Sequence, residues 1–68
     1  MASLFRDPVL VIFVDDDNRE LARLDNPLYL PRAGENVRLA GTPHVVERVG
    51  FDIPDGAVDR IWVVCRRV

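Results

Sequence analysis

Short apolar runs, separated by clusters of turn-forming residues, follow one another along the whole chain. The clusters recur about every ten residues, a spacing typical of a small sandwich or barrel. They fall at residues 15–18, 25–27, 31–34, 41–43 and 54–56. Valine is the commonest residue, with 11 copies, and β-branched side chains favour a pleated, half-buried sheet. The pattern predicts an all-β fold.

The first expected strand, residues 9–14, is apolar at every position. A strand with one face in water alternates between apolar and polar residues. We therefore expect this strand to be covered on both faces or to lie in an interface.

The segment at residues 18–25 allows two interpretations. Asp17 followed by Glu20 resembles a helix capping box, and Leu21 and Leu24 recur at helical spacing. In the alternative interpretation the chain turns back and forms a hairpin with the first strand. The run is short for a stable helix, so we favour the hairpin. An α+β fold with a short helix at 18–25 remains the alternative.

Prolines mark the middle of the chain. Residues 28–30 lie between Pro27 and Pro31, which cannot donate to a sheet ladder, so we expect an edge or a crossing segment there. A strand at residues 35–40 follows, with Val37 and Leu39 pointing inward.

Two further strands are expected at residues 44–51 and 60–66. In the first, the apolar positions Val46, Val49 and Phe51 are out of phase by one residue, which predicts a β-bulge near residues 47–48. In the second, alternation places Ile61, Val63 and Cys65 on one face, and Trp62, Val64 and Arg66 on the other.

A resemblance covers residues 30–49. The run begins with Leu30-Pro31, continues through Gly34-Glu35 and Val37-Arg38-Leu39, and ends with valines three apart at Val46 and Val49. It looks like short uncharacterised bacterial and phage-borne proteins with an SH3-like small barrel, although His44 stands where those proteins usually have an aromatic residue. The resemblance implies an antiparallel meander of about five strands closed into a barrel. It implies no catalytic residue and no ligand.

Length and composition describe one small globular domain spanning residues 1–68. Hydrophobic residues make up 49% of the chain and charged residues 29%, which is typical of a folded soluble protein. Residues 1–7 lie at the terminus and are expected to be disordered. We find no signal peptide and no apolar run long enough to cross a membrane, so a cytoplasmic location and no membrane partner are expected.

The inventory of reactive residues excludes several kinds of chemistry. All nine basic residues are arginine, so a Schiff-base lysine and a P-loop lysine are both excluded. Cys65 is the only cysteine, which rules out an internal disulfide and a four-thiolate zinc site within one chain.

The remaining polar groups also have ordinary structural interpretations. The acidic cluster at residues 15–20 lacks the glycine and the distal glutamate of a calcium loop. His44 and Cys65 are the only nucleophile and base that could pair, but a lone cysteine is usually a small core residue. The acidic residues of the last loop, Asp52, Asp55 and Asp59, fit turn chemistry. We therefore predict no enzyme, no metal and no cofactor.

The favoured function is a non-enzymatic protein-interaction module, acting as a homo-oligomer or as a small subunit of an assembly. An outward Trp62 beside Val64 and the first strand would form an apolar patch of the kind found at protein contacts. The candidate interaction residues are Trp62, Val64, Arg60, Arg66, Arg38 and Arg48.

The alternative function is nucleic-acid binding. Arginines interleaved with an aromatic residue suit single-stranded nucleic acid, with Arg67 joining the set. A formal net charge of −2, with Lys+Arg 9 against Asp+Glu 11, disfavours this interpretation.

Overall fold

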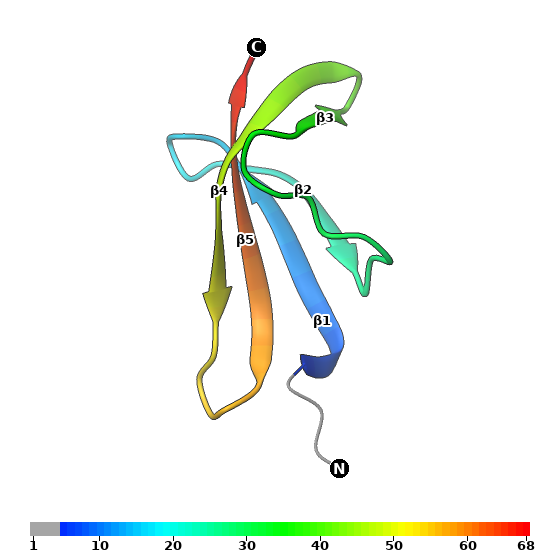
Figure 1. The fold of residues 1–68 in the computed structure, drawn as a ribbon, viewed down its shortest axis with the longest axis vertical. Helices are drawn as coiled ribbons and strands as arrows, with labels where there is room; N and C mark the ends of the chain where they lie inside the picture. Colours follow the sequence, from blue (N-terminus) through cyan, green and yellow to red (C-terminus); the bar gives the residue numbers. More distant parts are fainter. Residues whose placement is uncertain (1–4) are drawn as a thin grey trace.

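The computed structural model describes residues 5–68, and its side chains from Pro8 onward. It contains five strands: β1 (Phe5–Val14), β2 (Glu20–Asp25), β3 (Asn36–Leu39), β4 (Thr42–Asp52) and β5 (Val58–Arg67) (Figure 1). No helix occurs within residues 5–68, so the all-β prediction is confirmed. The expectation of disorder over residues 1–7 falls partly on residues 1–4, outside the described residues; β1 already begins at Phe5.

The alternative of a helix at 18–25 is wrong. Residues Glu20–Asp25 form β2, which pairs antiparallel with β1, as the hairpin interpretation requires. The acidic cluster makes the turn between them. The Asp15 carboxylate accepts hydrogen bonds from the main-chain N–H groups of Asp17 and Arg19, each at 2.9 Å, and Asn18 takes a positive φ of 64°. Asn and Asp are favoured in such turns because they bond their own backbone and tolerate this conformation.

The strands form one mixed sheet in the order β2-β1-β5-β4-β3. Strands β1 and β5 run parallel, and every other neighbouring pair is antiparallel. The predicted purely antiparallel meander is therefore wrong at this one junction. Pairing with β2 on one edge and with β5 on the other makes β1 an interior strand of the sheet. Interior strands with a parallel neighbour are commonly covered on both faces, which suits the unbroken apolar run of β1.

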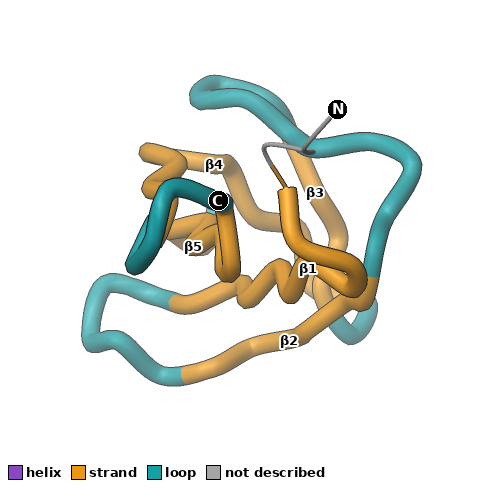
Figure 2. Tube along the Cα trace, turned by 90° about the horizontal axis from the view of Figure 1, so that it is seen from below, coloured by secondary structure: helices purple, strands orange, loops and turns teal. Residues whose placement is uncertain are grey.

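The sheet curls into a half-barrel that stays open between its two outer strands, β2 and β3 (Figure 2). Residues 26–35 connect these two strands without regular secondary structure. Leu30 in this connection packs against the core, and Pro31 is buried. The expectation of a crossing segment at residues 28–30 is confirmed.

The predicted β-bulge is also confirmed, because the pairing of β4 with β5 shifts register between Val46 and Arg48. The shift aligns Val46 with Cys65 and Val49 with Val63, so the inner residues of both strands share a face. The main core lies on this concave face. Its buried residues are Val11, Phe13, Val46, Val58, Ile61, Val63 and Cys65.

A smaller apolar cluster lies on the opposite, convex face. Ile12, Val14 and Val64 are buried there, with Leu10 and Trp62 packed against them. Strand β1 is thus covered on both faces, as its unbroken apolar run predicts. Across residues 5–68, no helix is long and apolar enough to span a membrane.

Candidate functional site

An open groove lies on the concave side, where the curled sheet fails to close. Its volume is about 810 Å³. It is bounded by strands β1, β2 and β3 and by the connection between β2 and β3, and it is lined by Phe13, Ala22, Leu24, Tyr29, Pro31, Glu35 and residues 36–40. A groove of this size is within the range of ligand-binding clefts.

Exposed apolar side chains gather around this groove. Leu24 is 47% exposed and Tyr29 is 64% exposed, although both are large side chains that usually pack inside. Phe13, which also lines the groove, is buried in the core. Large apolar side chains left open beside a groove are typical of a contact surface for another molecule.

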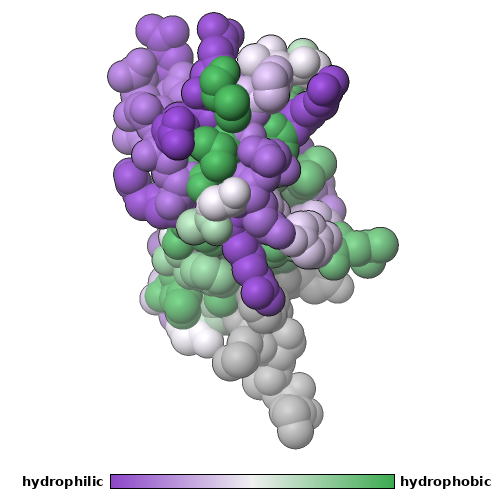
Figure 3. All heavy atoms as spheres, turned by 45° about the horizontal axis from the view of Figure 1, so that its top comes forward, coloured by the Kyte–Doolittle hydropathy of each residue, from purple (hydrophilic) through white to green (hydrophobic). Residues whose placement is uncertain are grey.

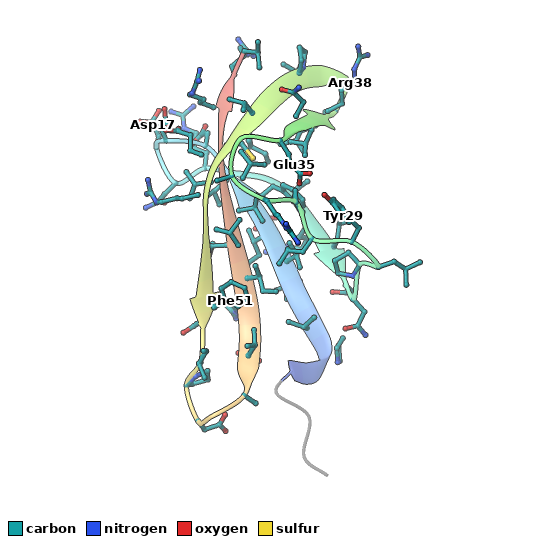
Figure 4. The ribbon with its side chains drawn as sticks, viewed as in Figure 1. Asp17, Tyr29, Glu35, Arg38 and Phe51 are labelled. Atoms are coloured by element: carbon teal, nitrogen blue, oxygen red, sulfur yellow. The ribbon has the colours of Figure 1, made fainter. Side chains whose placement is uncertain are left out.

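A hydrogen-bonded clamp fixes one wall of the groove. The Tyr29 hydroxyl lies 2.7 Å and 2.6 Å from the two carboxylate oxygens of Glu35, and the main-chain N–H of Arg32 donates to the same carboxylate at 2.6 Å. Figure 4 shows the Tyr29 and Glu35 side chains pointing toward one another, whereas Arg38 points away at the end of the β3–β4 hairpin. The clamp ties the irregular connection to the start of β3.

The same contacts shift two pKa values. Hydrogen bonding from Tyr29, then from the Arg32 main chain, lowers the pKa of Glu35, because both donors stabilise the charged carboxylate. The pKa of Tyr29 is raised, chiefly because its hydroxyl proton is held by Glu35. Both groups therefore keep their bonded protonation states at neutral pH.

The outer edge of β3 offers main-chain groups to the groove. Val46 donates its N–H to the carbonyl of Glu35 at 2.9 Å, so Glu35 faces β4. Antiparallel strands alternate the direction of their main-chain groups, so Val37 and Leu39 also face β4, while Asn36 and Arg38 direct theirs outward. A free strand edge thus runs along an apolar groove.

The residues predicted from the sequence to make contacts lie mainly on the convex face. Trp62 and Val64 share this face, and Trp62 lies opposite Gly50 on β4. A Cβ added at Gly50 would meet nothing within 4 Å, so the indole does not cover this glycine. Trp62 is half-buried and Val64 is only 8% exposed, so little apolar surface is left open there.

The pairing register places Arg48, Arg60 and Arg66 on the same convex face as Trp62 and Val64. Arg38 joins them from β3, since it pairs with Pro43. Arg67 pairs with His44 and lies on the opposite face. Arg60 lies across from Asp52, which offsets part of its charge. Figure 3 shows hydrophilic side chains crowding the upper end of the molecule, with more hydrophobic atoms below.

His44 and Cys65 both occupy the concave side of the sheet. His44 is 7% exposed, and the Nδ1 atom of its ring lies 2.9 Å from the carbonyl oxygen of Thr42. The Cys65 thiol is fully buried, 3.8 Å from the carbonyl oxygen of Val63. Burial, then the charge of Glu47, raises the pKa of Cys65, which disfavours the reactive thiolate.

The acidic residues in the described part of the chain do not converge on a metal site. Within residues 5–68, no group of three or more His, Cys, Asp or Glu side chains is placed to hold an ion. The Asp15 carboxylate is engaged by the turn, and Asp52 lies opposite Arg60.

Comparisons with protein-family models, curated proteins and solved structures give no significant match for this chain. The candidate site is therefore defined by its geometry.

Sequence patterns alone miss the residues that form the groove, namely Leu24, Tyr29 and Glu35. One usable signal is the pair of prolines at 27 and 31, which brings the 28–30 segment across the sheet. Residues 28–30 cross the core without forming a regular strand, so they cover it incompletely. The side chains of Leu24 and Tyr29 therefore remain exposed. The contact between Tyr29 and Glu35 depends on the fold of the connection, which no periodicity encodes.

Proposed function

We propose that this chain is a non-enzymatic protein-interaction module, or a small subunit of an assembly, that binds an extended segment of another protein in the groove. The observation that carries the proposal is the groove of about 810 Å³ beside the free edge of β3. An extended peptide can add to such an edge as a new strand, with its main chain supplying affinity and alternate side chains filling the pocket.

The side chains around the groove suit this type of ligand. A strand added to β3 would meet the main-chain groups of Asn36 and Arg38 at its edge. Every second side chain would then face Val37 and Leu39, which are half-buried on the concave side. We expect apolar residues at those alternate positions of the ligand, and an acidic residue where it passes the exposed Arg38.

We include in this proposal the resemblance of residues 30–49 to SH3-like small barrels. An added strand beside β3 would fill part of the opening in the curled sheet and bring it closer to a closed barrel. Closure would also satisfy main-chain groups that a sheet edge leaves to water.

The groove is a better binding site than the convex surface around Trp62, because its large apolar side chains are more exposed. Leu24 and Tyr29 are exposed in the groove, whereas Ile12, Val14 and Val64 on the convex face already bury one another. Burying apolar surface that is already covered adds little to binding.

The test uses a phage-displayed library of random peptides and the isotope-labelled full chain. Enriched peptides should show alternating apolar residues and should shift the amide NMR signals of Asn36 and Arg38. Leu24→Arg should weaken their binding about tenfold or more, because a charged side chain replaces the leucine that the bound peptide would cover. Leu28→Arg is the matched control, since Leu28 is fully exposed and does not line the groove.

Nucleic-acid binding on the convex face is the second candidate, supported by the placement of Arg48, Arg60 and Arg66 around Trp62. The same experiment includes a labelled single-stranded oligonucleotide at low and high salt. Binding that falls steeply with salt and is weakened by Arg48→Ala would favour this candidate. If no peptides are enriched, or if peptide binding is indifferent to Leu24→Arg, the groove function is wrong.

A further inference from the structure

The outer edge of β2 is the second free edge of the sheet. Strand β2 is an outermost strand in the order of the sheet, and Figure 2 shows it along the lower side of the fold. Arg23, Leu24 and Asp25 are all exposed along it. A free edge of this kind can pair with another strand unless its side chains prevent it.

Hydrogen bonds with β1 show which main-chain groups of β2 point outward. Asn26 donates its N–H to the carbonyl of Val9 at 3.0 Å, and its side-chain oxygen accepts the N–H of Val9 at 2.8 Å. Asn26 and, by alternation, Leu24 therefore face β1. The main-chain groups of Arg23 and Asp25 face away from the sheet.

We propose that the β2 edge pairs antiparallel with the β2 edge of a second copy of this chain. The register places Leu24 opposite Leu24 on the two-fold axis. Arg23 of each copy then lies opposite Asp25 of the other, and these are the residues whose main-chain groups point outward. Backbone bonding and side-chain charge thus select the same register.

Charge complementarity supports a second copy as the occupant. Opposite charges placed directly across two antiparallel strands attract, and a two-fold axis repeats the Arg23–Asp25 contact on both sides of the centre. Arg23 already forms an ion pair with Glu20 on its own strand. A guanidinium carries enough donors to bind a second carboxylate while keeping the first.

The β3 edge lacks this self-complementarity. In an equivalent pairing of two β3 strands, the outward residues are Asn36 and Arg38. Arg38 would lie opposite either Asn36 or another Arg38, and neither contact pairs opposite charges. The self-pairing is therefore assigned to β2, and it does not rest on the groove function proposed for β3.

The contact is small, because only Arg23, Leu24 and Asp25 of β2 pair in this register, and Leu24, 47% exposed, is the one large apolar side chain among them. Interfaces at the small end of the range are usually weak and reversible. Sedimentation from about 1 μM to about 1 mM should therefore show a concentration-dependent monomer–dimer equilibrium.

A charge exchange tests the register. Arg23→Asp alone places two acidic residues opposite each other, and Asp25→Arg alone places two basic ones; each should weaken dimerisation about tenfold or more. The double variant with both changes restores opposite charges and should restore the dimer. Arg38→Asp is the matched control on the other edge and should leave the dimer unchanged. Circular dichroism checks that each variant keeps its sheet.

Amide hydrogen exchange supplies an independent measurement. Protection of the Arg23 and Asp25 amides should rise with protein concentration, while the Leu24 amide, directed at β1, should be protected throughout. A chain that stays monomeric at every concentration would overturn the proposal. So would a dimer that the double variant fails to restore, or one that Trp62→Ala abolishes.

Discussion

At the scale of single residues, Ala40 in the turn between β3 and β4 adopts a backbone conformation that is unfavourable for alanine. Leu39 pairs with Thr42, so Ala40 and Gly41 form a two-residue hairpin loop, and both have positive φ, 53° and 82°. This is the type I′ geometry, for which Asn-Gly is the preferred sequence. Alanine is disfavoured at positive φ because its Cβ crowds the backbone.

Ala40→Asn should therefore stabilise the fold, by about 0.5–1 kcal/mol, because asparagine tolerates this conformation better than alanine. The urea midpoint of unfolding measures the gain. Ala33→Asn is the control, since Ala33 is exposed in the preceding connection and has no positive φ. An equal gain from both substitutions would contradict the explanation from turn geometry.

At the scale of elements, the connection between β2 and β3 depends on the clamp between Tyr29 and Glu35. The pKa of Glu35 is lowered from its ordinary value of 4.5, so its contribution to stability is complete above that value and is lost as pH falls through the folded pKa. The pKa of Tyr29 is raised from 10.0, so its contribution is complete below that value and is lost as pH rises through the folded pKa. The clamp is intact between these limits.

Tyr29 is the only tyrosine, so the ultraviolet absorbance of phenolate reports its ionisation directly. In the native protein the phenolate absorbance should have its midpoint at a pH above 10.0, the ordinary pKa of tyrosine. The reason is that ionisation breaks the hydrogen bond to a charged carboxylate. Glu35→Gln removes that charge and should move the tyrosine pKa back toward its ordinary value. An unchanged titration in this variant would show that the hydroxyl does not bond Glu35 in solution.

The strands and turns of this fold differ in how well the sequence predicts them. The hairpin at residues 18–25 follows from local turn chemistry, and the β-bulge follows from the phase of Val46, Val49 and Phe51. Both features are determined by neighbouring residues, so a pattern reveals them. The parallel contact between β1 and β5 is different, because an apolar run shows that a strand is covered but not which strand lies beside it.

The candidate site was less predictable for the same reason. Alternation correctly separates Trp62 from Ile61 and Val63, yet it cannot show that Ile12 and Val14 already cover much of that face. The groove exists because β2 and β3, although consecutive in the chain, are the two outer strands of one curled sheet. Its residues come into proximity only through topology, and no spacing along the chain marks them.

At the scale of the whole molecule, β1 joins two otherwise local units. One unit is the hairpin of β1 with β2, and the other is the meander from β3 to β5. The parallel pairing of β1 with β5 is the strand contact that connects them. Val11 lies at this junction, opposite Ile61, and is fully buried in the main core.

Val11→Ala should therefore destabilise both units together. Loss of two buried methyl groups and the resulting cavity should cost about 1–3 kcal/mol. A chain of 68 residues has a total stability of only about 3–10 kcal/mol, so the loss is a large fraction of it. Val68→Ala is the matched control, since Val68 is 73% exposed.

Urea unfolding should be followed by the fluorescence of Trp62, the single tryptophan, and by circular dichroism of the whole sheet. If β1 couples the units, both signals should shift to lower urea by the same amount and remain one transition. If Trp62 in the meander keeps its midpoint while the circular dichroism shifts, the two units unfold separately. Coupling matters for the proposed peptide binding as well, because the groove has walls from both units and persists only while they stay joined.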